Sequence, residues 1–296
     1  MHSFYLPPGN LDLIAVTGAD AAKLLQGQLT CDVDAVPDPG FARGALCNNK
    51  GRVFATFILV RNGPAFHLVL GKGLGTILIA AVKKYLPFYK CELRQAAADE
   101  YCGGAAGAAT ITALGLDAAA LPPQGKCAAV ADGWICTLDQ SQQQYLVYSH
   151  KPLPVPAGTS TGTLNDWLMC GMRSGQFPFV AGDQEKYTPQ ELHLDRHEYV
   201  SFTKGCYTGQ EIVARMHYRG KMKKLLFLLE AAAPGAAPAD PMEVLDANDH
   251  LLGTSIKLLH ANGEVLALAP LPAELENNTA ALVKNAAGLR FSSRIF

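Results

Sequence analysis

One short segment combines a thiol, an amine and a helix start. It reads Lys204-Gly205-Cys206-Tyr207-Thr208-Gly209-Gln210-Glu211. Thr208 and Glu211 have the spacing of a capping box, which predicts a helix that begins at Thr208. Cys206 would then precede a helix N-terminus, whose partial positive charge favours a thiolate. If the stretch is extended, Lys204 shares a face with Cys206 and favours the thiolate further. The pattern indicates a reactive cysteine; the alternative is a buried thiol that only packs.

Positive charge is concentrated around the same segment. Residues 196–224 contain seven lysines and arginines and two glutamates, in a chain whose net charge is −1. This pattern fits a site for an anionic ligand, and a solvated surface would give the same pattern. Because the chain as a whole is not basic, any nucleic-acid contact must come from this local region.

The helix predicted to begin at Thr208 would carry Ile212, Val213 and Met216 on its inward face.

The elements that position this segment are predicted from apolar periodicity. Near the N-terminus we expect strands at 11–16, 41–47, 52–60, 66–70 and 91–94. A helix is expected to follow Asp20, and another to span 74–86. We interpret the order as β-α-β-β-α-β, a ferredoxin-like unit.

A second α+β unit is expected next, followed by a small barrel. Strands are predicted at 126–129, 134–138 and 145–148 and a helix at 163–173, whereas residues 95–123 are poorly patterned. A Pro/Ala-rich linker at 231–241 precedes short alternating segments at 242–245, 253–259, 265–268, 280–283 and 289–291, and 224–229 supplies a first strand. The fold class is therefore α+β, with domains at 1–225 and 226–296.

Several classes of protein are disfavoured. The eight cysteines form no C-x-x-C pair, which argues against a disulfide framework and a preformed metal site. His193 and His197 have a spacing that suits a metal if helical, but no third ligand is evident, and we expect both to be exposed. The N-terminus lacks the pattern of a secretory signal, and no apolar run reaches the length of a membrane span. We expect a cytoplasmic protein.

The segment at 204–211 resembles the signature of the YgfZ folate-binding proteins, which are relatives of the aminomethyltransferase (T-protein) of the glycine cleavage system. Three further pieces resemble the same family and occur in its order. They are residues 25–32 (LQGQLTCD), 44–52 (GALCNNKGR) and 214–220 (ARMHYRG).

The resemblance implies a ring of three subdomains that holds tetrahydrofolate or a one-carbon derivative in its central opening. Cys206 matches the functionally implicated cysteine, and Lys204 accompanies it. The folate's anionic glutamate tail is expected near Arg215, Arg219 and Lys221. Members of the family support iron–sulfur enzymes, including a tRNA-methylthiolating enzyme, and thereby tRNA modification. The residues expected to contact the ligand are Lys204, Tyr207, Gln210, Arg215, Glu191, Arg173 and Trp167.

Two departures from the aminomethyltransferase bear on activity. Residues 52–57, which match a stretch with a catalytic aspartate in that enzyme, contain no carboxylate. Arg173 stands where that enzyme has a glutamate that recognises the pterin, and an arginine cannot act as a base at neutral pH. We therefore expect a folate-dependent assembly or repair factor. Two alternatives stay open: one-carbon (aminomethyl) transfer, and direct tRNA binding through the basic region, which predicts a steep salt dependence.

Overall fold

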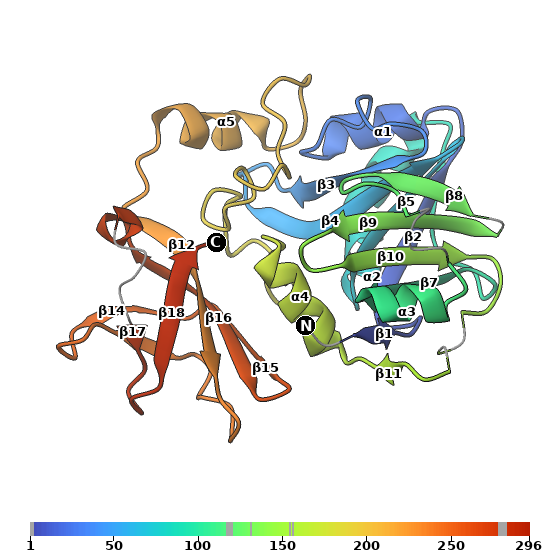
Figure 1. Ribbon diagram of the computed structural model, residues 1–296. Coiled ribbons are helices and arrows are strands. Elements are labelled where there is room, and N and C mark those ends of the chain that lie inside the picture. The colour runs from blue at the N-terminus through green and yellow to red at the C-terminus, as the bar shows by residue number, and fades with distance from the viewer. Residues whose placement is uncertain (1–2, 117–120, 131, 154, 156, 278–282) are drawn as a thin grey trace.

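A computed structural model describes residues 3–116, 121–130, 132–153, 155, 157–277 and 283–296. Its first sheet has five antiparallel strands, which are accompanied by two α-helices and a 3₁₀ helix (Figure 1). In spatial order the strands are β3 (Gly40–Cys47), β4 (Val53–Asn62), β5 (Ala65–Gly71), β2 (Leu11–Thr17) and β6 (Glu92–Gln95). The helices are α1 (Ala21–Gln28), α2 (Leu74–Val82) and the 3₁₀ helix η1 (Lys83–Phe88).

The predicted strands and helices of this unit are found, but the predicted order is wrong by one strand. Three strands, β3 to β5, stand between α1 and α2, whereas a ferredoxin-like unit has two. Strand β4 is buried on both faces. Phe57 and Leu59 join the core that includes α1 and α2, while Ile58 and Val60 join a core with the second sheet. This explains the nearly continuous apolar run in its sequence.

The second sheet packs on the first and is antiparallel except where β1 pairs with β11. Its strands in order are β11 (Ser160–Thr161), β1 (Phe4–Leu6), β7 (Tyr101–Ala106), β10 (Gln144–Ser149), β9 (Gly133–Asp139) and β8 (Cys127–Val130). Helix α3 (Ala108–Ala113) covers its outer face, and α4 (Leu164–Arg173) begins with a Thr163–Asp166 capping box. Strand β7 and α3 lie in the poorly patterned stretch.

The structure contains a disulfide that the sequence analysis did not predict. Cys127 and Cys136 face each other across β8 and β9 and form a disulfide. Their nine-residue separation follows from the hairpin, not from a cysteine motif. Of the free cysteines, Cys206 is exposed, Cys91 is half-buried and the others are buried.

A third, antiparallel sheet curls at the C-terminal end of the chain (Figure 1). Its described strands in order are β14 (Leu251–Thr254), β13 (Glu243–Leu245), β17 (Val283–Lys284), β18 (Arg290–Ile295), β12 (Lys224–Ala232), β16 (Glu264–Pro272) and β15 (Lys257–Ala261), with η3 (Ala273–Asn277) following β16. The strand predicted at 253–259 is two strands, β12 extends into the predicted linker, and most of the strand predicted at 280–283 lies outside the described residues.

An irregular segment, residues 174–209, joins α4 to α5 (Gln210–Arg219) and packs against the curled sheet. Within it, His193 is buried rather than exposed. Its Nδ1 lies 2.8 Å from the carbonyl oxygen of Phe296, and its Nε2 accepts a hydrogen bond from the Leu226 amide at 3.1 Å. Burial lowers the pKa of His193, and His197 is half-buried. The prediction of two exposed histidines is therefore wrong.

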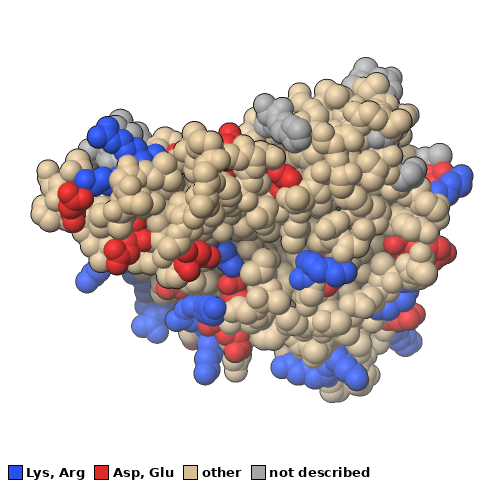
Figure 2. Space-filling view, turned by 90° about the horizontal axis from the view of Figure 1, so that it is seen from below, with Lys and Arg blue, Asp and Glu red and all other residues tan. Residues whose placement is uncertain are grey.

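Figure 2 shows one face of the molecule, on which most residues are uncharged and basic and acidic side chains lie among them. Among the described residues, no helix is long and apolar enough to cross a membrane.

Candidate functional site

Lys204 anchors the loop that presents Cys206. Its ammonium donates to three main-chain carbonyls at and beyond the end of α1: Gln26 at 2.8 Å, Leu29 at 2.7 Å and Cys31 at 2.8 Å. The side chain also lies over the Tyr207 ring, with Nζ 5.3 Å from the centroid. Lys204 is only 8% exposed, and burial lowers its pKa. The lysine thus holds the loop against α1, where a cation is favoured by the negative end of the helix dipole.

The second half of the loop is fixed by Thr208 and Gly209. The Thr208 hydroxyl donates to Oε1 of Gln28 at 2.9 Å. Gly209 has a φ of 85°, and a Cβ there would collide with the carbonyl oxygen of Asn48. Helix α5 begins one residue later and has no side-chain cap. The predicted capping box between Thr208 and Glu211 is therefore wrong, because the threonine is bonded to α1 and the left-handed glycine occupies the N-cap position.

Cys206 lies on the outer side of this anchored loop. It is exposed, and a Cβ built on the neighbouring Gly205 would meet no atom within 4 Å. Because Lys204 is buried and Cys206 is exposed, the two side chains do not share a face, and that prediction is wrong. The cysteine is also farther from the helix start than predicted, four residues before α5. What the loop provides is an accessible thiol on a rigid support.

Helix α5 is held by one buried residue. The prediction that Ile212, Val213 and Met216 face inward is correct for Val213; Ile212 is exposed and Met216 is half-buried. The carbonyl oxygen of Val213 accepts a hydrogen bond from the Gln190 side chain at 2.9 Å. A Cβ on Gly51 would meet Ile212 at 2.9 Å. The helix therefore rests on the β3–β4 turn and leaves most of its surface free.

Three of the four segments that resemble the family in sequence meet at this loop; the fourth, residues 214–220, lies on and just after α5. The three are the α1 end around Gln26–Cys31, the turn at Asn48–Gly51 and the loop itself, and their contacts are those of Lys204, Thr208 and Gly209. Segments that are far apart in sequence thus build one support for Cys206.

Of the other residues in this region that were predicted to contact the ligand, some are buried and some are exposed. Tyr207 is buried, and burial raises its pKa. The main-chain amide of Gln210 donates to the carbonyl of Tyr207 at 3.1 Å, and Arg215 is exposed on α5. Glu191 accepts from the Thr188 amide at 2.7 Å and pairs with an Arg52 nitrogen at 3.3 Å, beside the β3–β4 turn.

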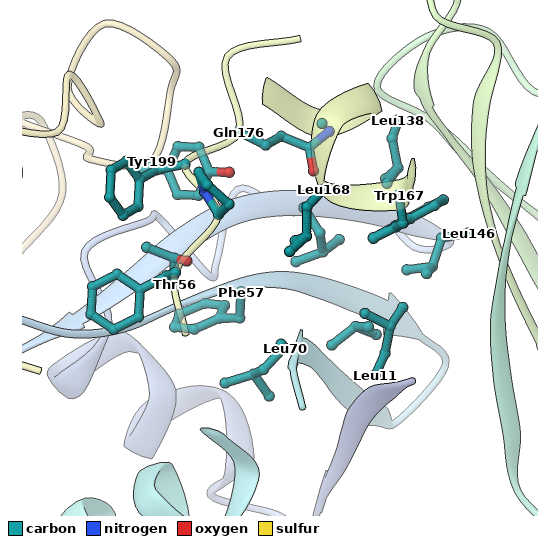
Figure 3. Close-up of a pocket in the computed structure, with 17 residues that line it drawn as sticks. Leu11, Thr56, Phe57, Leu70, Leu138, Leu146, Trp167, Leu168, Gln176 and Tyr199 are labelled. Carbon is teal, nitrogen blue, oxygen red and sulfur yellow. The ribbon is translucent and has the colours of Figure 1, made fainter. Parts of the chain in front are cut away.

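Trp167 lines an apolar cavity of about 70 Å³ between the first sheet and α4. In Figure 3 its ring lies among side chains from both sheets, and Thr56, Phe57, Gln176 and Tyr199 border the same space. Gln176 donates to the side chain of Gln144 at 2.8 Å. The lining that the structure describes contains no aspartate or glutamate. From β4 the lining includes Thr56, Phe57 and Ile58, none of which carries a carboxylate.

Arg173 lies elsewhere, at the junction of α4 and the curled sheet. Its guanidinium contacts Glu230 of β12, with Nε at 2.8 Å, and Glu264 of β16 at 2.7 Å. These residues border a separate cavity of about 470 Å³. Sequence reasoning missed both glutamates, because their partner is some 60 to 90 residues away in the chain. Within the described residues, no cluster of three or more potential metal ligands is present.

The overall fold is similar to that of a solved enzyme structure. The chain resembles the crystal structure of glycine cleavage system aminomethyltransferase T from Bartonella henselae, with a TM-score of 0.68 and 14% identity, over 99% of this chain and 85% of the other. No family model matches the sequence.

Curated relatives make the family specific. The chain is 32% identical over 278 residues to the tRNA-modifying protein YgfZ of Pectobacterium atrosepticum, covering 89% of this chain and 82% of that protein. It is 30% identical over 281 residues to the protein of the same name from Vibrio vulnificus strain YJ016, covering 91% and 84%. The chain belongs to the YgfZ family.

Proposed function

We propose that this chain is a tetrahydrofolate-binding accessory protein that supports the synthesis or repair of iron–sulfur enzymes and thereby tRNA modification. The observation that carries the proposal is the anchored loop, which leaves Cys206 exposed while Lys204 and Thr208 bind α1. Relatives named as tRNA-modifying proteins support the cellular role. The client enzymes would include a tRNA methylthiotransferase, and the protein would act in the cytoplasm.

The proposed architecture is a ring of three subdomains, with a folate-binding domain at 1–225 and a barrel-like domain at 226–296. The three sheets and the curl of the third are compatible with it. Strand β12, the first of the curled sheet, begins at Lys224, close to the proposed boundary.

The cavity at Trp167 has the right chemistry for a folate ring but not the full volume. Its aromatic side chains, Phe57, Trp167 and Tyr199, would stack on a flat heterocycle, and the Gln176 amide could hydrogen-bond its edge. At about 70 Å³ it is smaller than the roughly 300 Å³ of a typical small-molecule site. Binding would therefore require side chains at the mouth to separate. Bound folate would supply one-carbon or redox chemistry, while this chain holds the ring and positions the thiol.

The uncharged lining favours an accessory role over aminomethyl transfer. No carboxylate borders the described cavity to act as a general acid or base. Single-turnover assays with an amine donor and tetrahydrofolate test this directly. Formation of methylene-tetrahydrofolate would overturn the accessory role.

Calorimetric titration with tetrahydrofolate tests ligand binding. Wild type should bind, Cys206→Ser should bind equally, and Trp167→Ala should bind at least about tenfold more weakly, because it removes a stacking surface. Trp167 fluorescence should change on binding if the cavity opens. Absence of binding by the wild type would refute the folate proposal.

A further inference from the structure

The C-terminal part of α5 and the residues after it form a strongly basic surface. We call it the α5 patch; its members are Arg215, Arg219, Lys221, Lys223 and Lys224. All five side chains are exposed. In the described part of the chain, none of them lies within 4.0 Å of a carboxylate oxygen. Figure 1 shows α5 at the edge of the molecule, with no helix or strand above it in that view.

The spacing of the cations on α5 lowers the stability of that helix. Arg215 and Arg219 are four residues apart on one helix, and like charges at that spacing destabilise a helix by about 0.2–0.5 kcal/mol. Elsewhere in the described chain nine lysines and arginines lie within 4.0 Å of a carboxylate oxygen. Lys257 contacts Asp183 at 2.6 Å, and Arg94 contacts Glu100 at 2.6 Å. An unpaired cluster at one place in a chain of net charge −1 therefore indicates an anionic partner.

Aromatic rings stand beside these cations. Phe202 stacks on His217 with centroids 3.7 Å apart, and Tyr218 meets the His217 ring edge-on at 4.9 Å. Tyr218 is 70% exposed, although it is a large apolar ring. An exposed aromatic ring that is held in place by contacts with neighbouring rings offers a surface on which an unpaired nucleic-acid base can stack.

We propose that the α5 patch binds RNA, with Arg and Lys on phosphates and Tyr218 stacked on an unpaired base. Cations alone would fit any polyanion, and the supported ring favours a single-stranded or loop region over a duplex or an acidic protein surface. Because α5 begins four residues after Cys206, bound RNA would lie next to the loop that presents the thiol. Because Arg215, Arg219 and Lys221 are also the residues expected near the folate's glutamate tail, RNA binding is measured without folate and folate binding without RNA.

Fluorescence anisotropy with a labelled RNA stem–loop tests the proposal. If five phosphates are neutralised, the logarithm of the association constant should fall with the logarithm of salt concentration with a slope of about −3.5, a loss of roughly 100-fold between 50 and 200 mM. Arg219→Gln/Lys221→Gln/Lys223→Gln should reduce the magnitude of the slope by about 2. Lys83→Gln/Lys84→Gln/Lys90→Gln removes the same charge from exposed residues after α2 and should leave the slope unchanged.

A second pair of variants tests stacking. Tyr218→Ala should weaken binding of the stem–loop by about tenfold or more and leave binding of a duplex without a loop unchanged. The matched control is Phe88→Ala, which removes an aromatic ring that is 80% exposed elsewhere. The proposal is overturned if wild type does not bind RNA at about 50 mM salt, if both charge variants behave alike, or if a polyglutamate peptide binds as tightly as RNA. Folate titration of the same preparation is read separately, so failure of one proposal leaves the other tested on its own.

Discussion

The ammonium of Lys204 donates all three of its hydrogen bonds to main-chain carbonyls. Sequence reasoning places this lysine beside the thiol, because alternation along an extended strand would put residues 204 and 206 on one face. The loop is bent instead, and the carbonyls at the end of α1, which no local pattern reveals, bind the lysine. A loss of function in a Lys204 variant would therefore report first on the support of the loop.

Lys204→Met should lower the free energy of unfolding by about 3 kcal/mol, because it leaves buried carbonyls without a donor. Urea denaturation of wild type and variant measures the difference. Lys223→Met is the control, since Lys223 is exposed, and should change stability by less than about 0.5 kcal/mol. Equal effects of the two substitutions would contradict the anchoring role.

His67 makes stability depend on pH. It is 6% exposed between Trp134 and Tyr148, and its Nδ1 has no hydrogen-bond partner. Burial lowers its pKa to about 4. The unfolded chain, with an ordinary histidine pKa of about 6.5, binds a proton before the folded chain does, so stability should fall as pH decreases from about 6.5 to about 4.

Between pH 7 and pH 5, His67 should account for a loss of about 2 kcal/mol. Urea denaturation at both pH values measures the total, and His67→Gln should lose about that much less than wild type. His193, whose pKa burial also lowers, contributes in both proteins and cancels in the comparison. An identical pH dependence in the two proteins would show that His67 is already protonated or solvated in the folded state.

At the scale of elements, periodicity predicts the regular strands and helices well and the junctions poorly. Helix α1 buries Ala21, Leu24, Leu25 and Gln28, as its spacing predicts. The start of α5 is not predictable in the same way, because the Thr208 hydroxyl has a competing acceptor on Gln28, which is distant in sequence. Strand β7 is missed because Gly103 and Gly104 give it no apolar alternation. A Cβ on Gly104 would lie 2.5 Å from the ring of Trp167.

The two glycines of the loop should respond differently to substitution. Gly209→Ala forces a side chain into a positive φ and against the Asn48 carbonyl, and should cost about 2–4 kcal/mol of stability. Gly205→Ala meets open space and should cost less than about 0.5 kcal/mol. Thermal or urea unfolding of the pair checks this. Similar costs for both would mean that the loop does not rest on the β3–β4 turn.

At the scale of the whole molecule, long-range contacts join units that sequence reasoning can only place side by side. Arg173 ties α4 to the curled sheet through Glu230 and Glu264. Residues 174–209 have no regular periodicity, so their burial and the anchoring of His193 to Phe296 could not be predicted. The disulfide between Cys127 and Cys136 depends on the register of β8 and β9, which the spacing of cysteines does not reveal.

Arg173→Leu should destabilise the protein by about 1–2 kcal/mol, because it leaves two glutamates facing each other without a cation; their partial exposure keeps the cost modest. Adding Glu230→Gln should recover part of the loss. Arg196→Leu, which removes a more exposed ion pair with Glu276, should cost less than about 0.5 kcal/mol. Equal costs for the two arginine variants in urea denaturation would remove Arg173 as a link between the units.

The proposed role depends on the thiol of Cys206 acting in the cell. The decisive measurement is iron–sulfur enzyme activity in a strain that lacks the gene, with variant copies supplied at equal protein abundance. Cys206→Ser should fail to restore the activity, whereas Cys91→Ser, at a half-buried free cysteine, should restore it. Full restoration by Cys206→Ser would contradict the account.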